Sequence, residues 1–338
     1  MPDNQLAATT YKKLVADISR LYEGARKALV EAYWGGGQRI VLVEQRGEIR
    51  AAYGAGLLVK LSEDLTRRLG AGFSVENLKR MRRFYLENQK RSPATQLPLS
   101  HQIELLSVRD RKKRLELEKR AEEEALDRDG LRELIRHEKV RKQVAENLAK
   151  GPGSFSPELL KMPKFGLPGA YQIKDPRDTA WPDKNFLLLD HGFKGYQALI
   201  PGESRGLKAG DIVEWTGAKL LKTRRTVKDL YTYKAYLESV IDGDTFWVVL
   251  DTGMRGISRQ KLRLRGIDCP EIDTKEGQAA KAFVEKILKG VPSLTVLSSK
   301  NATYDRYEAD IIFTGHDGKE HYLNNLLLEN GLAVRVGE

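Results

Sequence analysis

The apolar positions in the first 70 residues repeat at helical spacing. Between residues 9 and 33 they lie three or four positions apart, as on one face of a helix. The sequence WGGGQ follows at 34–38, and its three glycines are expected to interrupt or end that helix. Further helical patterns lie near 38–48 and between 58 and 69, and the latter stops at Gly70.

The helical pattern continues to residue 140. Ser74 is placed to N-cap the next helix, and Phe73 and Leu78 have the spacing of a hydrophobic staple. Helices dense in both charges follow, and Asp129 is a candidate N-cap for the last of them. A cluster of short helices with a basic one among them predicts an all-α, helix-turn-helix-like domain over residues 1–150. An ordinary helical bundle with a solvated polar face is the alternative.

The pattern changes after residue 150. Residues 151–185 are rich in glycine and proline, which is typical of a linker. Short apolar runs between turns predict a small β-rich segment at 186–230. From 231 to 338, alternating residues predict several strands with one helix inserted and one after them, as in a five-stranded OB-type barrel. The predicted fold class is therefore α+β multidomain.

The composition favours a polyanionic partner. Lys and Arg total 58 against 47 Asp and Glu among 338 residues, a net charge of +11. Residues 231–338 hold 14 basic and 16 acidic side chains, a net of −2, whereas residues 1–230 carry +13. The positive surplus therefore lies outside the predicted barrel.

The sequence also restricts the class of protein. A single cysteine excludes an intramolecular disulfide framework and a cysteine-rich zinc site. No run approaches the roughly 20 apolar residues of a membrane span. The first residues lack the basic and apolar regions of a signal peptide. We therefore expect a cytoplasmic protein with no membrane partner.

Acidic and basic residues of two motifs within 240–271 suggest phosphodiester chemistry. VIDGDT contains Asp244, and RLRGIDCPE contains Arg263, Asp268 and Glu271. Hydrolysis needs a base for water, a positive group for the phosphoryl oxygens and, in many enzymes, a hard cation with oxygen ligands. Neighbouring barrel strands would bring the motifs together. Asp-Gly is also a common turn dipeptide, so ordinary acidic turns are the alternative.

Three features outside these motifs have a functional and a structural interpretation. His191 follows an apolar run, where packing is favoured over a ligand role. The basic segment 219–230 contacts phosphate or is a solvated face. The same alternatives apply to the cations of the predicted helix after Ser74, which are the candidate nucleic-acid-binding residues Lys79, Arg80, Arg82 and Arg83.

Residues 10–140 resemble the N-terminal helical domain of YhcG-type proteins. GFSVENLKRMRRFY, LSHQIELLSVRDRKKR and YWGGGQRIVLVEQ carry the likeness. In that family the domain usually precedes a PD-(D/E)XK nuclease domain, and the resemblance implies a role in DNA binding or assembly. No convincing PD-(D/E)XK core is recognisable downstream in this sequence, so a different catalytic half is expected.

Residues 232–336 resemble the staphylococcal nuclease (thermonuclease) family. VIDGDT, RLRGIDCPE and TYDRYEAD occur in the family's order, and YLNNLLLEN followed by GLAVRV matches its closing helix and strand. The resemblance implies that Asp244, Asp268 and the backbone carbonyl of Cys269 bind Ca²⁺, with Mg²⁺ or another divalent ion as the alternative. It also implies that Glu271 is the general base or orients the water, and that Arg263 binds phosphate.

The resemblance extends to the third motif. Aligning its alanine puts Arg306 on the second catalytic arginine and Tyr304 on the neighbouring tyrosine, whereas aligning its aspartate would put Ala309 at the arginine position. Asp305 replaces the usual glycine. Asp242 and Thr245 match residues that support the metal ligands or the substrate.

These observations predict a metal-dependent endonuclease that gives 5′-hydroxyl and 3′-phosphate ends. The family cleaves DNA and RNA, and the usual company of YhcG-type domains favours DNA and a role in genome defence, such as defence against phage. The basic helical domain, 1–150, is expected to tether the nuclease-like domain, 231–338, to nucleic acid. A non-catalytic nucleic-acid-binding protein and an assembly protein that forms homo-oligomers through its helical domain are the alternatives.

Overall fold

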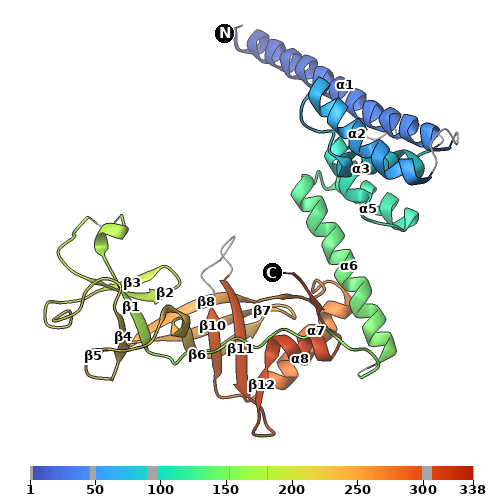
Figure 1. Ribbon diagram of the computed structural model, residues 1–338. Helices are drawn as coiled ribbons and strands as arrows, with labels where there is room; N and C mark the ends of the chain where they lie inside the picture. The colour runs from blue at the N-terminus through green and yellow to red at the C-terminus, as the bar shows by residue number, and fades with distance from the viewer. Residues whose placement is uncertain are drawn as a thin grey trace. The chain divides into compact units, whose positions relative to one another are not determined.

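The computed structural model describes residues 3–45, 51–89, 97–151, 153–180, 182–298 and 307–337 (Figure 1). The chain forms two compact units, residues 1–136 and 137–338. Among the described residues, the first is helical, and the second contains a five-stranded sheet, a six-stranded sheet, a two-stranded strand pair and two further α-helices. In the described part of the chain, every helix is too short or too polar to cross a bilayer.

The predicted all-α character of the N-terminal region is confirmed. Its described helices are α1 (Asp3–Gln45), α2 (Ala51–Leu69), α3 (Val75–Glu87), α4 (Leu99–Leu105), α5 (Arg111–Glu123) and α6 (Arg128–Lys150). The boundary between the two units falls within α6.

The expected break at WGGGQ is wrong, because α1 continues through all three glycines. Two of them allow close packing against α3 instead. A Cβ on Gly37 would lie 2.0 Å from the carbonyl oxygen of Met81, and one on Gly36 would lie 3.4 Å from the Met81 sulfur. Glycine is destabilising within a helix, but here its missing side chain lets two backbones approach.

The α3 start agrees with the prediction, and the α6 start does not. The Ser74 hydroxyl accepts the Asn77 backbone N–H at 3.2 Å, and Phe73 packs in one apolar cluster with Leu78. At α6, the carboxylate of Asp127 accepts the Gly130 backbone N–H at 2.7 Å. Asp129 lies inside the helix and is not its cap.

The first sheet of the second unit has five antiparallel strands in the order β3-β2-β1-β4-β5. The first of them lies inside residues 151–185, where we expected only a linker. Alternation explains it, because Tyr171 and Ile173 are buried and their neighbours are half-buried. The strands are β1 (Ala170–Lys174), β2 (Leu188–Gly192), β3 (Gly195–Ala198), β4 (Ile212–Trp215) and β5 (Leu220–Lys222).

The second sheet is the predicted five-stranded barrel of OB type. Strands β6, β7, β8, β11 and β10 follow one another, and β10 closes the ring by pairing with both β11 and β6. Strands β8 and β11 are parallel, and the other pairs of the ring are antiparallel. The bounds are β6 (Thr232–Val240), β7 (Thr245–Gly253), β8 (Gly256–Leu264), β10 (Leu294–Ser298), β11 (Tyr307–Thr314) and the edge strand β12 (Glu320–Tyr322).

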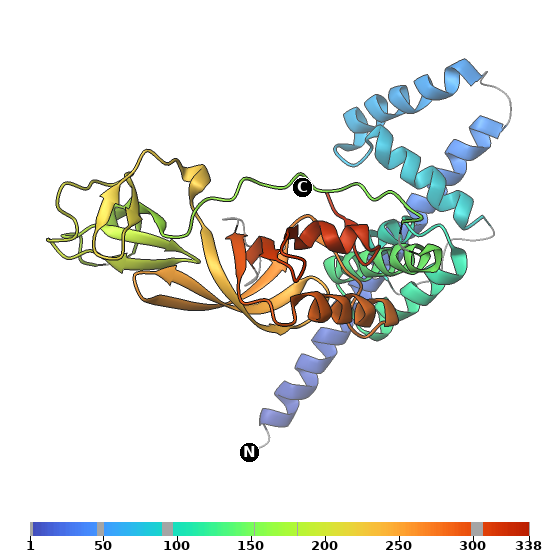
Figure 2. The ribbon, with the colours of Figure 1, turned by 90° about the horizontal axis from the view of Figure 1, so that it is seen from below.

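Two helices and one short strand pair complete the barrel. Figures 1 and 2 show α7 (Lys275–Leu288) beside α8 (Leu323–Glu329), and their apolar residues join the barrel core. Strand β9 (Ile267–Asp268) pairs with β13 (Val334–Arg335). The fully buried amide of Asn324 donates to the carbonyl of Arg265 at 3.0 Å and accepts the Ile311 N–H at 3.2 Å. It thereby fixes the turn between β8 and β9.

The small sheet packs directly on the barrel. Tyr171 donates its hydroxyl to the carbonyl of Thr252 at 2.8 Å, and Tyr233 donates to the carbonyl of His191 at 2.8 Å. The His191 ring lies 3.1 Å from the Thr252 carbonyl and 3.0 Å from the Gln197 amide oxygen. His191 therefore has the packing role that the sequence favoured.

The segment before β1 lies along the barrel. Leu160 exchanges two backbone hydrogen bonds with the Asn325 side-chain amide, at 2.9 and 3.1 Å, and packs against the barrel core. The Gly166 N–H donates to the hydroxyl of Thr232 at 2.9 Å. Glu158 forms an ion pair with Arg335.

Candidate active site

The turn between β6 and β7 positions Asp244. Its backbone N–H donates to the Asp242 carboxylate at 3.0 Å, which closes the turn. A Cβ on Gly243 would lie 2.7 Å from Ala280 and 2.8 Å from the Cys269 sulfur, so a larger residue would push the turn away from the barrel. Glycine is therefore required for Asp244 to reach its place.

Asp244 is bound on both carboxylate oxygens. Its exposure is 3%, and its Oδ1 accepts the Thr245 hydroxyl at 2.9 Å. Its Oδ2 accepts the Cys269 backbone N–H at 2.8 Å and lies 3.5 Å from the guanidinium of Arg263. Thr245 and Arg263 are direct partners across β7 and β8, so strand register brings the two motifs together.

Asp268 completes the cluster from β9. It is 1% exposed, and its carboxylate forms an ion pair with Arg263. Asp244 and Asp268 therefore share one guanidinium, which is itself one-quarter exposed. An open face on Arg263 is what a phosphoryl oxygen would need.

The cluster carries more acid than base. Burial raises the pKa of the Asp244 carboxyl above its usual range, and Arg263 only partly opposes this effect. Burial also raises the pKa of the Cys269 thiol, with Asp244, Asp242 and Asp268 adding to the effect. The thiol is therefore neutral and serves as a small buried side chain.

The donor set fits a hard cation. Two buried carboxylates beside the Cys269 backbone are oxygen donors of the kind that calcium prefers, and water and phosphate would supply the remaining ligands. Among the described residues, no group of three or more His, Cys, Asp or Glu side chains is arranged as a metal site. A cation here would therefore depend on main-chain and substrate oxygens as well as on Asp244 and Asp268.

Glu271 lies two residues beyond Cys269 and is half-exposed. Its Oε1 lies 3.0 Å from Nε2 of His137, which lies in the first half of α6. Nothing in the sequence motifs signalled this histidine, because it is far from Glu271 along the chain.

The backbone of Glu271 is held separately. Its carbonyl accepts the Thr274 hydroxyl at 2.7 Å, and Thr274 also N-caps α7. A Cβ on Gly277 would lie 2.0 Å from the same carbonyl oxygen. The first turn of α7 therefore presses closely on the candidate base and fixes its position.

The part of the third motif that contains the predicted second arginine lies outside the described residues. Arg306 and Tyr304 both belong to the stretch between β10 and β11 that the structure does not describe. The register of β11 places Glu308 beside Arg263.

The four candidate nucleic-acid-binding cations divide into two groups. Lys79, Arg80 and Arg83 line a pocket in the helical unit. Arg82 instead donates to Glu44 of α1 at 2.9 Å and is absent from that pocket. Arg128 and Arg132 of α6 also line the pocket, and no sequence pattern had identified them as candidates.

Two protein-family models match the chain. Residues 12–142 match the DUF1016 N-terminal domain, and residues 261–337 match the Staphylococcal nuclease homologue. The chain is thus similar to the first family over most of its described helices α1–α6 and to the second over the later part of the barrel. The second match includes Arg263, Asp268 and Glu271 but begins after Asp244, and the closed barrel supplies the missing strands β6 and β7.

One curated relative is similar over part of its length. A protein of Escherichia coli (strain K12) named "Putative nuclease YhcG" is 44% identical over 84 residues. The match covers 22% of this chain and 22% of that protein. The chain thus spans about a fifth of that relative's length in this comparison.

Proposed function

We propose that this protein is a metal-dependent nuclease that hydrolyses phosphodiester bonds, with DNA preferred to RNA. The observation that supports it best is the pair of buried carboxylates, Asp244 and Asp268, around one partly open arginine, Arg263. Glu271 follows in the same motif and keeps half of its side chain exposed to water. The match to the nuclease-like family model supports the same conclusion.

The proposed reaction divides the work among these side chains. Glu271 takes a proton from water as the water oxygen attacks phosphorus. The Arg263 guanidinium stabilises the negative charge that develops on the phosphoryl oxygens. The bond from phosphorus to the 5′ oxygen breaks, and that oxygen takes a proton from solvent. The products carry a 5′-hydroxyl and a 3′-phosphate.

Asp244, Asp268 and the carbonyl of Cys269 would hold calcium in this proposal. A bound divalent ion supplies Lewis-acid neutralisation of a nonbridging oxygen. The sequence assigns Arg306 as a second phosphate-binding group, with Tyr304 next to the substrate. The proposal includes a role in genome defence, because the helical region resembles domains of YhcG-type proteins, whose usual company favours that role.

A direct assay tests the proposal. Purified full-length protein should cleave labelled DNA in calcium and be inactive with chelator, and mapping of the product ends should give 5′-hydroxyl termini. Equal cleavage with and without chelator would exclude the metal-dependent mechanism. Binding without cleavage under all tested divalent ions would favour the non-catalytic alternative.

Metal binding has a readout that is independent of activity. Calcium should raise the Tm of the protein, because a ligand that binds only the folded state stabilises it. Asp244→Asn should abolish the calcium-dependent rise, while Asp251→Asn, an exposed change at the far end of β7, should preserve it.

A further inference from the structure

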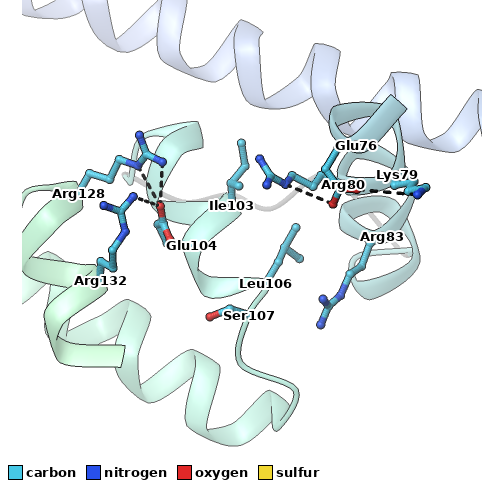
Figure 3. A pocket seen from close by; sticks show the side chains of 10 residues that line it. All are labelled: Glu76, Lys79, Arg80, Arg83, Ile103, Glu104, Leu106, Ser107, Arg128 and Arg132. Atoms are coloured by element: carbon cyan, nitrogen blue, oxygen red, sulfur yellow. Dashed lines mark hydrogen bonds and ion pairs between the residues drawn. The ribbon is translucent and has the colours of Figure 1, made fainter. Parts of the chain in front are cut away.

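The helical unit contains a pocket of about 450 Å³ between α3 on one side and α4 with the start of α6 on the other (Figure 3). Five cationic and two acidic side chains line it, together with Ile103, Leu106 and Ser107. The cations exceed the acids by three. The cations are Lys79, Arg80, Arg83, Arg128 and Arg132, and the acids are Glu76 and Glu104.

Glu104 orients one wall of the pocket. A single oxygen of its carboxylate accepts hydrogen bonds from Arg132 at 2.8 Å and from Arg128 at 2.9 Å. The hydrogen bond from Arg132 holds the pKa of Glu104 below its usual value, so the carboxylate stays charged. Each guanidinium has five N–H donors, and one shared carboxylate leaves several available although Arg132 also contacts Asp129.

The cationic side chains of the opposite wall, on α3, have weaker acidic partners. Lys79 and Arg80 share Glu76 at 3.8 and 4.0 Å, which are long distances for ion pairs. Arg83 is exposed, and no ion pair is recorded for it among the described residues. Figure 3 shows Arg80 and Arg83 on the α3 side, facing the Arg128 and Arg132 side across the pocket.

The shape of the pocket narrows the choice of ligand. Planar guanidinium groups on two walls suit the oxygens of a phosphate, which accept paired hydrogen bonds. The apolar side chains of Ile103 and Leu106 provide a surface for a sugar or base. The volume lies within the range of pockets that hold small ligands rather than single ions.

We infer that this pocket binds the phosphate group of a nucleotide, either free or within a nucleic-acid strand. Arg83 and Arg80 contact the phosphate from α3, and Arg128 and Arg132 contact it from α6. The inference rests on the proposed function only in taking nucleic acid as the physiological source of the nucleotide. It assigns binding to a surface whose residues take no part in the proposed cleavage.

The test measures binding by full-length protein in chelator, so that cleavage does not enter. Fluorescence anisotropy with labelled single- and double-stranded DNA compares wild type with Arg83→Ala, Arg128→Ala and the double variant. We expect the double variant to weaken binding by about tenfold and to lower the slope of log Kd against log salt by about two. Arg128→Ala leaves Arg132 on Glu104, and circular dichroism checks that all three variants fold.

Arg67→Ala is the matched control. Arg67 is an exposed arginine of the same helical unit, but it lies on α2 and pairs with Asp64 outside the pocket. The Kd of this variant should stay within about twofold of wild type. Equal losses in the Arg67 and Arg83 variants would overturn the pocket assignment in favour of a diffuse charge effect, and so would unchanged binding in the double variant.

A competition experiment separates the two sources of phosphate. Displacement of the labelled strand by thymidine 5′-monophosphate, lost in the double variant, identifies a pocket for a free nucleotide. Displacement only by unlabelled strands identifies a backbone phosphate. Loss of cleavage in Glu271→Gln with unchanged binding concerns the nuclease alone, so the two proposals can fail separately.

Discussion

The candidate active site and the helical-unit pocket both contain carboxylate–guanidinium ion pairs, but the ratio of carboxylates to guanidinium groups is opposite in the two places. In the barrel, Asp244 and Asp268 share the single guanidinium of Arg263. In the helical unit, Arg128 and Arg132 share the single carboxylate of Glu104. The first arrangement leaves an excess of buried negative charge, and the second leaves an excess of positive charge at a pocket.

The difference shows that the ratio of partners, rather than the presence of an ion pair, determines what a charged cluster can bind. Excess carboxylate in a buried place favours a cation. Excess guanidinium on an open wall favours an anion. The chain as a whole has the same division, with its positive surplus in residues 1–230 and a slight negative charge beyond.

The largest expected effect comes from removing the groups that act on phosphorus. Arg263→Ala and Glu271→Gln should each lower kcat by about a thousandfold, because transition-state stabilisation and proton transfer are lost. Cleavage of a labelled duplex in calcium measures this. Arg259→Ala on the same strand and Glu285→Gln on α7 are matched controls that should retain near-normal rates. Full activity in both active-site variants would disprove the assigned roles.

The second-largest expected effect is that of salt concentration, which should change KM and kcat to different extents. If the helical unit supplies nucleic-acid affinity through about three phosphate contacts, KM should rise by more than about tenfold between 50 and 200 mM salt. The value of kcat should change little, because Asp244 and Asp268 are buried. Steady-state kinetics at several salt concentrations provide both numbers. A salt-independent KM would contradict the division of labour.

A smaller effect should come from His137. It contacts Glu271 at 3.0 Å, so we expect His137→Ala to lower kcat about tenfold by releasing the glutamate from one orientation. KM should stay near its wild-type value. His137→Gln, which retains a hydrogen-bond donor, should restore part of the rate. A matched loss in both variants would mean that the imidazole does not act by positioning Glu271.

The smallest effect concerns stability. Glu104 has a lowered pKa in the folded state, so its contribution is present above the unfolded-state pKa and disappears as pH falls through the folded-state value. Glu104→Gln should therefore lower the free energy of unfolding by about 1 to 2 kcal/mol at neutral pH. Urea denaturation across the acidic range should show the difference shrinking. A constant difference would assign the effect to packing.

The sequence predicted the barrel and much of its site because the relevant residues are local. Asp244 is the last residue of the turn between β6 and β7, and Arg263 and Asp268 are only five positions apart, on the consecutive strands β8 and β9. Strand alternation then fixes which side chains enter the core. The all-α region was predicted for the same reason, since helical spacing is a short-range signal.

The features that were missed depend on contacts between distant segments. The three glycines within α1 were expected to break the helix, but Gly37 is required by the Met81 backbone, which only the packed structure reveals. His137 reaches Glu271 across more than a hundred residues. Glu104 forms its ion pairs with Arg128 and Arg132 only once α4 and α6 have packed together. Neither periodicity nor motif spacing carries such information.

The segment around Leu160 changes where the nuclease-like part should be cut. Its backbone is paired with the Asn325 amide, and a Cβ on Gly266 would lie 2.9 Å from its side chain. A fragment that starts at the family match or at β6 would uncover this surface and leave the amide unpaired. For protein engineering, the folding unit is therefore longer than the stretch that matches the family model, and expression fragments should begin upstream of Glu158, which pairs with Arg335.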